Sequence, residues 1–198
     1  GANLNSRVEI KWILSENLNE KNIKKSLKNI DGVIVAPGFG ERGVEGKICA
    51  IKYVRENSIP FFGICLGMQC ACIEFSRNVL GHKKGNSTEF DKNTPYPIID
   101  LMEEQKEIKN KGGTMRLGSY KCSLEKGSHI NKIYKKIDIK ERHRHRYEFN
   151  NSYKKEFNDN GMLTTGTNNK LNLVEVIELN NHPWFIGTQF HPEYRSRV

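Results

Sequence analysis

Ile59-Pro-Phe-Phe-Gly-Ile-Cys65-Leu-Gly67 is the stretch that decides the fold, because an apolar run ends there in a cysteine between two glycines. A short, continuous apolar run is typical of a strand buried on both faces of a parallel sheet. The next residues, Leu66 to Leu80, have a helical pattern, so the sequence predicts a strand, a tight turn and a helix. A side chain on such a turn projects from the carboxyl end of the sheet, which makes Cys65 a candidate nucleophile.

The residues before this stretch also alternate between strand and helix patterns. Gly32–Ala36 predicts a second strand buried on both faces, followed by the glycine-rich loop Pro37–Gly43 and a helix from Val44 to Asn57. Val8–Leu14 is rich in β-branched and aromatic residues and predicts a strand, and Asn19–Asn29 predicts a short exposed helix. The alternation predicts the α/β class, with an open, mostly parallel central sheet flanked by helices.

The residues after Leu80 have a different pattern. Gly81–Gly113 is polar and predicts loops with at most one short strand, Ile98–Met102. Further along, alternating residues predict antiparallel strands that extend the sheet, and a short helix at Ser152–Asn160. These strands are predicted at Thr114–Leu124, Glu141–Phe149, Met162–Thr167, Asn172–Leu179 and Trp184–Phe190. No domain boundary is evident, so the chain is interpreted as a single domain.

Length, composition and charge exclude several classes of protein. A length of 198 residues suits one domain and leaves little room for a synthase with several substrates. No apolar run approaches the roughly 20 residues of a membrane span and no signal peptide is evident, which predicts a cytoplasmic protein without a membrane partner. Five cysteines without a Cys-x-x-Cys pair predict a reducing compartment and no metal site. The net charge of +9 permits an anionic partner without requiring one.

A cysteine nucleophile needs a group that shuttles protons, and His191 is the candidate among six histidines. It follows the predicted strand Trp184–Phe190, which would bring it to an edge of the sheet. Pro192 favours an extended backbone at His191, in which residues two apart point to the same side. Glu193 can then accept a hydrogen bond from the imidazole and fix its tautomer. Cys65, His191 and Glu193 are the predicted catalytic residues.

Two of these motifs, Pro60–Gln69 and Gln189–Glu193, resemble those of the class I (triad) glutamine amidotransferases. Five further segments, in the same order along the chain, are similar to segments of the glutaminase domain of the CTP synthases. They are Gly43–Lys47, Asn86–Asp91, Gly112–Gly118, Glu141–Glu148 and Asn181–Phe185. The resemblance extends from about Val8 to the C-terminus and supports the fold class predicted above.

The resemblance implies hydrolysis of L-glutamine. Cys65 would attack the side-chain amide, and His191, oriented by Glu193, would pass a proton to the leaving ammonia and then activate the water that hydrolyses the thioester. Backbone amides near Gly38 and at Leu66 would form the oxyanion hole. The resemblance also implies that substrate is bound by Gly38, Leu66, Gly67, Met68, Gln69, Glu89 and Arg146. Of these residues, Glu89 suits the α-ammonium group of glutamine and Arg146 suits its α-carboxylate.

The resemblance places the other reactants outside this domain. A synthetase domain of the same full-length chain would bind ATP, UTP and Mg²⁺ and use the ammonia to aminate UTP to CTP. No cofactor is expected in the glutaminase domain, GTP is an implied activator with Phe39–Arg42 as a family-level contact, and the full-length protein is expected to be a homotetramer. Relative to the family, residues 1–198 would be one glutamine amidotransferase domain that lacks the first strand and helix and the last helix. The family's Pro-Gly-Gly is replaced by Ala36-Pro37-Gly38.

Two alternatives remain open on the residues alone. One is a stand-alone cysteine hydrolase of γ-glutamyl compounds, which needs no partner. The other is a non-catalytic regulatory or nucleic-acid-binding module, for which Arg142-His-Arg-His-Arg146 is the basic cluster. One short basic run is a small electrostatic footprint, and we expect no nucleic-acid partner.

Overall fold

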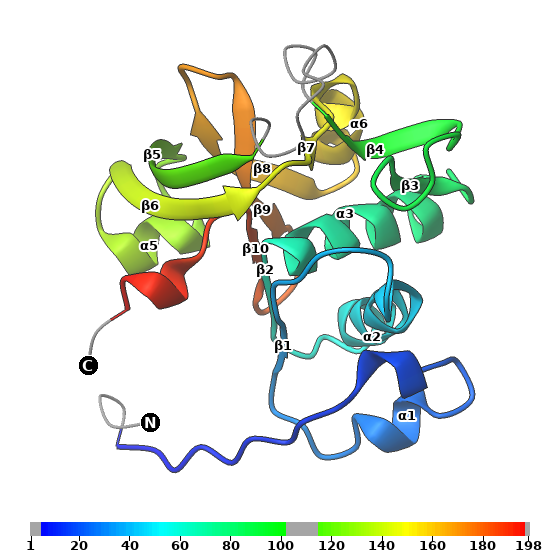
Figure 1. Ribbon diagram of the computed structural model, residues 1–198. Coiled ribbons are helices and arrows are strands. Elements are labelled where there is room, and N and C mark those ends of the chain that lie inside the picture. The colour runs from blue at the N-terminus through cyan, green and yellow to red at the C-terminus, as the bar shows by residue number, and fades with distance from the viewer. Residues whose placement is uncertain (1–4, 102–114, 197–198) are drawn as a thin grey trace.

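The computed structural model describes residues 5–101 and 115–196, and Figure 1 shows their strands and helices. The strands are β1 Val33–Val35, β2 Phe61–Ile64, β3 Gly85–Ser87, β4 Tyr96–Asp100, β5 Arg116–Leu124, β6 Asp138–His145, β7 Glu148–Phe149, β8 Met162–Asn168, β9 Leu173–Leu179 and β10 Phe185–Thr188. The α-helices are α1 Ile23–Ser26, α2 Val44–Glu56, α3 Leu66–Asn78, α5 His129–Tyr134 and α6 Lys154–Asp159. Short 3-10 helices are η2 Ser15–Asn17, η4 Asn151–Tyr153 and η5 Pro192–Tyr194.

Strand β2 lies inside the parallel part of the main sheet. It pairs in parallel with β1 on one side and β10 on the other, so that Phe61 is opposite both Val33 and Phe185. The rings of Phe61 and Phe185 pack with their centroids 4.3 Å apart. The strands predicted within Gly32–Ala36 and Ile59–Ile64 are confirmed.

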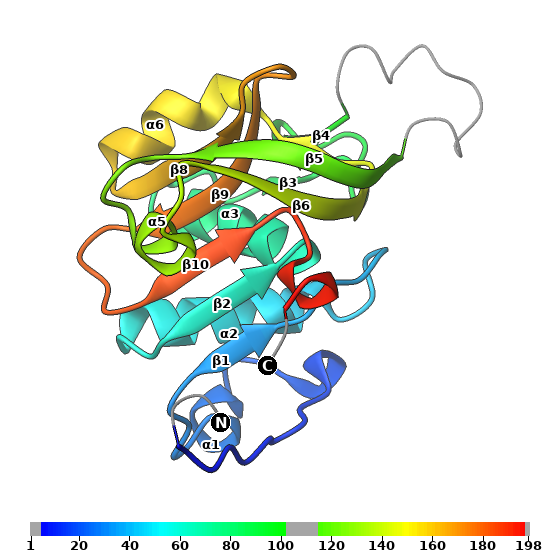
Figure 2. The ribbon, with the colours of Figure 1, turned by 90° about the vertical axis from the view of Figure 1, so that its left-hand side faces the viewer.

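The rest of the main sheet is antiparallel. From β10 onward each strand pairs antiparallel with the next, which gives the order β1-β2-β10-β9-β8-β5-β6. Figure 2 shows this order, with β1 near one end of the molecule and β5 and β6 near the other. The predicted α/β class, with parallel strands, flanking helices and added antiparallel strands, is confirmed.

Helices α2 and α3 lie side by side behind the parallel strands (Figure 2). Every residue of α3 from Leu66 to Ser76 is buried, because the sheet covers one side of this helix and α2 covers another. The Arg55 guanidinium of α2 is 2.8 Å from the carboxylate of Glu74 in α3, an ion pair that holds the two helices together. The start of α3 is therefore fixed against the end of β2, where Cys65 lies.

The prediction of a strand at Val8–Leu14 is wrong. The segment is extended, but none of its residues belongs to a strand, and it runs along the outside of the molecule (Figure 1). Four of its apolar side chains, those of Val8, Ile10, Trp12 and Leu14, are exposed, while Ile13 packs against the hydrophobic core. A strand needs a hydrogen-bonded neighbour, and no strand of the described residues lies beside this segment. The prediction that Gly32–Ala36 is buried on both faces is also wrong, because Ile34 of the outer strand β1 is exposed.

The polar segment Gly81–Gly113 contains more strand than predicted. Both β3 and β4 lie in it, and with β7 they form a separate three-stranded sheet. The predicted strand Ile98–Met102 overlaps β4, while Met102 lies outside the described residues. Short strands with glycine, proline and polar residues carry little periodicity, which is why the sequence did not predict β3.

Three other elements differ from their predictions. The helix expected over Asn19–Asn29 is shorter, with α1 limited to one turn whose Ile23 is buried. The strand expected over Glu141–Phe149 is divided into β6 and β7. Helix α5 was not predicted, because six residues are too few for a clear helical period. Among the described residues, no helix combines the length and the apolar character needed to cross a bilayer.

Candidate active site

Cys65 occupies a sharp turn between β2 and α3. Its φ of 53° and ψ of −103° are sterically unfavourable for a residue with a side chain. Two glycines make the turn feasible. A Cβ atom on Gly63 would lie 2.7 Å from the carbonyl carbon of Gly67, and a Cβ atom on Gly67 would lie 2.2 Å from the carbonyl oxygen of Val35. The predicted strand, turn and helix are therefore present, and the glycines allow the close backbone approach that the turn requires.

The Cys65 thiol is almost fully enclosed, with the residue 2% accessible to solvent. Burial raises the pKa of this thiol to about 12, while a hydrogen bond from the backbone amide of Leu66 acts in the opposite direction. The amide of Leu66 lies at the start of α3, where backbone N–H groups favour negative charge. The turn thus places a sulfur atom beside a donor, in a site that excludes most water.

His191 follows β10 and is paired with Glu193. The His191 Nδ1 and Glu193 Oε1 atoms are 2.7 Å apart. Because a carboxylate only accepts, Nδ1 is the donor of this hydrogen bond. Nε2 is buried and has no hydrogen-bond partner among the described residues. The contact predicted between these side chains is present, but it is made through the 3-10 turn Pro192–Tyr194 and not through extended backbone.

The order of the strands brings Cys65 and His191 to one edge of the sheet. Strands β2 and β10 are parallel neighbours, with Ile64 opposite Thr188. The backbone amide of Cys65 donates a hydrogen bond of 2.7 Å to the carbonyl oxygen of Thr188. Both residues follow the carboxyl ends of these strands, and the charge of Glu193 contributes to the raised pKa of the Cys65 thiol. Residues 126 positions apart in the chain thus lie at the same edge of the sheet.

A small cleft opens beside Cys65. Of the residues predicted from the sequence, five line it: Gly38, Cys65, Gln69, Glu89 and Arg146. The remaining walls come from Phe39, Met115, His145 and Tyr147. Glu89 and Arg146 supply opposite charges, as binding of an α-amino acid would require.

The other predicted residues have different surroundings. Leu66 and Met68 are buried in the hydrophobic core, so their side chains contribute packing. Gly67 packs against the backbone of Val35, which leaves no room for a larger residue. His191 and Glu193 do not belong to the set that lines the cleft.

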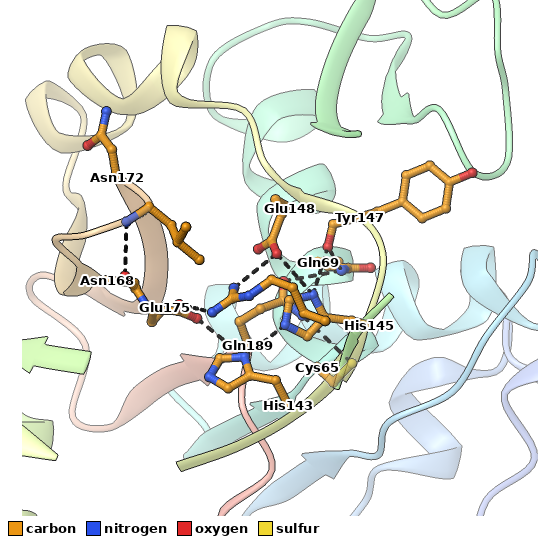
Figure 3. A network of polar contacts seen from close by, with 12 residues as sticks. Cys65, Gln69, His143, His145, Tyr147, Glu148, Asn168, Asn172, Glu175 and Gln189 are labelled. Carbon is orange, nitrogen blue, oxygen red and sulfur yellow. Dashed lines mark hydrogen bonds and ion pairs between the residues drawn. The ribbon is translucent and has the colours of Figure 1, made fainter. Parts of the chain in front are cut away.

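A buried network of charged groups behind the cleft was not predicted from the sequence (Figure 3). The Arg116 guanidinium donates to Glu148 at 2.9 Å and to Glu175 at 2.8 Å. The Nδ1 atom of His143 is 2.8 Å from Nε2 of His145. Burial, helped by the charge of Arg116, lowers the pKa of His143 to about 3, and burial also lowers that of His145, so both rings are neutral at pH 7.

The alternation of residues along β6 could have predicted the two histidines of this network. In Arg142-His-Arg-His-Arg146 the histidines are buried and Arg142 and Arg144 are exposed, because alternate residues of β6 point to opposite faces. The five residues were interpreted as one basic cluster, whereas a period of two would have separated an inner from an outer face. Among the described residues, no group of three or more His, Cys, Asp or Glu side chains is arranged to hold a metal ion.

All 198 residues match the model of the glutamine amidotransferase class-I family. The chain therefore belongs to that family. Within it, the chain is similar to the CTP synthases of Cytophaga hutchinsonii, with 60% identity, and Christiangramia forsetii, with 58% identity, in both cases over its whole length. It spans 37% and 36% of these two relatives, so it corresponds to about a third of each.

Solved structures agree with this assignment. The glutaminase domain of Trypanosoma brucei CTPS, solved with bound acivicin, superposes with a TM-score of 0.91 at 38% identity. The match covers 98% of this chain and 76% of that one. A glutamine amidotransferase from Thermotoga maritima, 16% identical, matches with a TM-score of 0.53 over 84% of this chain and 58% of that one. This second likeness concerns the fold alone.

Proposed function

We propose that this chain hydrolyses the side-chain amide of L-glutamine, with Cys65 as nucleophile, His191 as proton carrier and Glu193 as the residue that orients His191. One observation carries the proposal. Cys65 and the His191–Glu193 pair follow the carboxyl ends of two adjacent parallel strands that are joined by the hydrogen bond between Cys65 N and Thr188 O.

The proposed reaction has two halves. Cys65 loses its proton to His191 Nε2, and its sulfur attacks the amide carbon while the carbonyl oxygen gains negative charge next to the backbone amide of Leu66 and the loop at Gly38. His191 returns the proton to the nitrogen, the carbon–nitrogen bond breaks and ammonia leaves a thioester. A water molecule, deprotonated by His191, then attacks the thioester and releases glutamate and the thiol.

The walls of the cleft suit the rest of the substrate. The Glu89 carboxylate would bind the α-ammonium group and the Arg146 guanidinium the α-carboxylate, each by charge-assisted hydrogen bonds. The backbone from Leu66 to Gln69 would face the amide end of the substrate, since the side chains of Leu66 and Met68 point into the core. Recognition of both α-substituents would favour a free amino acid over a peptide.

The ammonia is proposed to serve a synthetase part that aminates UTP to CTP with ATP and Mg²⁺. The supporting observation is that the CTP synthases above share 58–60% identity with the whole chain and are almost three times as long. A cytoplasmic location, activation by GTP and a homotetramer of the full-length protein belong to the same proposal.

Labelling with a chloroketone analogue of glutamine tests the nucleophile. We expect one equivalent of label on Cys65, protection by glutamine, and no label at this position in Cys65→Ala. Label on Cys49 or Cys70 instead would contradict the assignment.

Glutamine turnover tests the proton carrier. His191→Ala is expected to lower it on the order of 10²- to 10⁴-fold, because general acid–base catalysis contributes about that much. His129→Gln, at a histidine on the surface helix α5, is the matched control and should stay within about twofold of the parent chain. Equal turnover in His191→Ala and the parent chain would refute the triad.

A further inference from the structure

Gln189 lies next to the Cys65 sulfur and has no role in the mechanism above. Its side-chain nitrogen Nε2 is 3.7 Å from Cys65 Sγ, within the range of a hydrogen bond to sulfur (Figure 3). The residue is fully buried. Its backbone amide donates to the carbonyl oxygen of Glu175 at 2.8 Å, so the main chain at this position is held by the neighbouring strand β9.

The direction of the Gln189 amide is determined by the groups around it. The nitrogen Nε2 of Gln69 donates to the carbonyl oxygen of Tyr147 at 3.0 Å, and a carbonyl oxygen can only accept. The same nitrogen is 3.2 Å from Oε1 of Gln189. With the oxygen of Gln189 held by this donor, its nitrogen has to face Cys65.

The carbonyl oxygen of Tyr147, which accepts from Gln69, is itself held in place by a second donor. Nδ1 of His145 lies 3.2 Å from the carbonyl oxygen of Tyr147, which therefore has two donors. The His145 ring is in turn 2.8 Å from His143, within the buried network. The orientation of Gln189 thus depends on residues of β6, α3 and the segment between β6 and β7.

We propose that the Gln189 side-chain amide is a catalytic hydrogen-bond donor that stabilises the Cys65 thiolate, and that Gln69 is the positioning residue that aims it. The inference rests on the proposed role of Cys65 as nucleophile. A donor that faces sulfur favours the anion over the thiol, because the anion is the stronger acceptor. The effect matters here because burial raises the pKa of Cys65 to about 12 and so opposes ionisation.

The donor acts at two points of the reaction. It favours proton transfer from Cys65 to His191 before the attack, and it stabilises the sulfur when the thioester breaks and the thiolate leaves. An amide nitrogen cannot give up its proton at neutral pH, so Gln189 supplies a hydrogen bond without competing with His191 as a base.

The experiment measures alkylation of Cys65 by iodoacetamide as a function of pH in the full chain, with the modified cysteine identified by mass spectrometry. In Gln189→Met the donor is lost, and the alkylation rate at pH 7 should fall about 10- to 100-fold, since a hydrogen bond to a charged group contributes about 1.5–3 kcal/mol. Below the pKa of the thiol the rate follows the thiolate fraction, so the whole plot of rate against pH should move to higher pH by about one to two units. Gln189→Glu should give a larger shift, because a carboxylate beside the sulfur repels the thiolate.

Two further variants separate this effect from a structural one. Gln69→Leu releases the Gln189 amide without removing it and should shift the profile in the same direction by a smaller amount. Thr165→Val is the matched control, because Thr165 is a similarly buried residue of the main sheet whose hydroxyl donates to the carboxylate of Glu178 and not to sulfur. Its pH profile should be unchanged.

The outcomes distinguish the two proposals. If Cys65 is alkylated at the same rate at each pH in Gln189→Met, Gln189→Glu and the parent chain, the role of Gln189 is refuted and the role of Cys65 stands. If Cys65 of the parent chain is not alkylated at any pH, the proposed nucleophile is refuted. Circular dichroism spectra matching those of the parent chain establish that each variant is folded.

Discussion

The backbone amide of Gly40 donates a hydrogen bond of 2.9 Å to Oε1 of Glu89. This contact joins the glycine-rich loop that follows β1 to the segment that follows β3, and both segments line the cleft next to Cys65. The carboxylate proposed to bind the α-ammonium group of glutamine therefore also holds the loop that carries Gly38 and Phe39. The Glu89 carboxylate would therefore serve both the binding of substrate and the position of the loop.

Replacing Glu89 by Gln separates these two roles. The new glutamine side chain keeps an oxygen that can accept the hydrogen bond from Gly40, but it has no negative charge. The KM for the substrate glutamine should therefore rise about 10- to 100-fold, while kcat changes little. Steady-state kinetics of ammonia release measure both constants. Asp91→Asn is the matched control, an exposed acid two residues away that should leave KM within about twofold. An unchanged KM in Glu89→Gln would exclude charge recognition by Glu89.

Adding a methyl group at Gly67 should destabilise the turn that carries Cys65. The new Cβ atom would lie 2.2 Å from the carbonyl oxygen of Val35, and backbone at this distance must move. We expect Gly67→Ala to lower the free energy of unfolding by about 1–3 kcal/mol, as other overpacked sites do. Denaturant unfolding measures the loss. Gly32→Ala, whose Cβ atom would have an ordinary contact of 3.5 Å with Pro60, should cost far less.

Removing the Arg116 charge should destabilise the fold strongly. Arg116, Glu148 and Glu175 are all buried, and Arg116→Met would leave two carboxylates without their cation. The expected loss is about 3–5 kcal/mol in free energy of unfolding. The loss should be larger at high pH, because burial raises the pKa of both acids and protonation would neutralise them as the pH falls. Arg42→Met, which breaks an exposed pair with Glu16, should cost no more than about 1 kcal/mol.

His143 should make stability depend on pH below neutrality. In the unfolded chain a histidine gains its proton near pH 6.5, whereas burial keeps folded His143 neutral down to its pKa of about 3. The unfolded state then binds more protons, so stability that is complete above pH 6.5 is lost as the pH falls. We expect His143→Asn to reduce the slope of unfolding free energy against pH by about 1 kcal/mol per pH unit between about pH 6 and pH 4.

Phe190→Leu is the control for this slope. Phe190 packs edge-on against the His143 ring with centroids 6.0 Å apart, but it does not titrate. This variant should lower stability by a similar amount at every pH. If the plots of unfolding free energy against pH are parallel for His143→Asn and the parent chain, His143 does not contribute to the pH dependence of stability.

The sequence predictions succeeded where residues close together in the chain decide the structure, and failed where a distant neighbour decides it. The apolar run before Cys65 and the helical pattern after it identified β2, the turn and α3. The extended pattern of Val8–Leu14 was equally clear, yet no strand forms, because pairing depends on a neighbour that the pattern does not describe. Glu89 was named only through the family resemblance, and Gln189 was quoted in a motif without being singled out.

The sequence by itself determined the apolar runs, the turn that needs glycine on both sides of Cys65, and the family to which the chain belongs, because these depend on residues close together in the chain. Only the tertiary structure decided which distant residues meet at the cleft. Parallel pairing of β2 with β10 places the His191–Glu193 pair at the same edge as Cys65, and β6 sends its histidines inward to the Arg116 network. Contacts of this kind depend on the register of strands far apart in sequence, and local periodicity contains no information about that register.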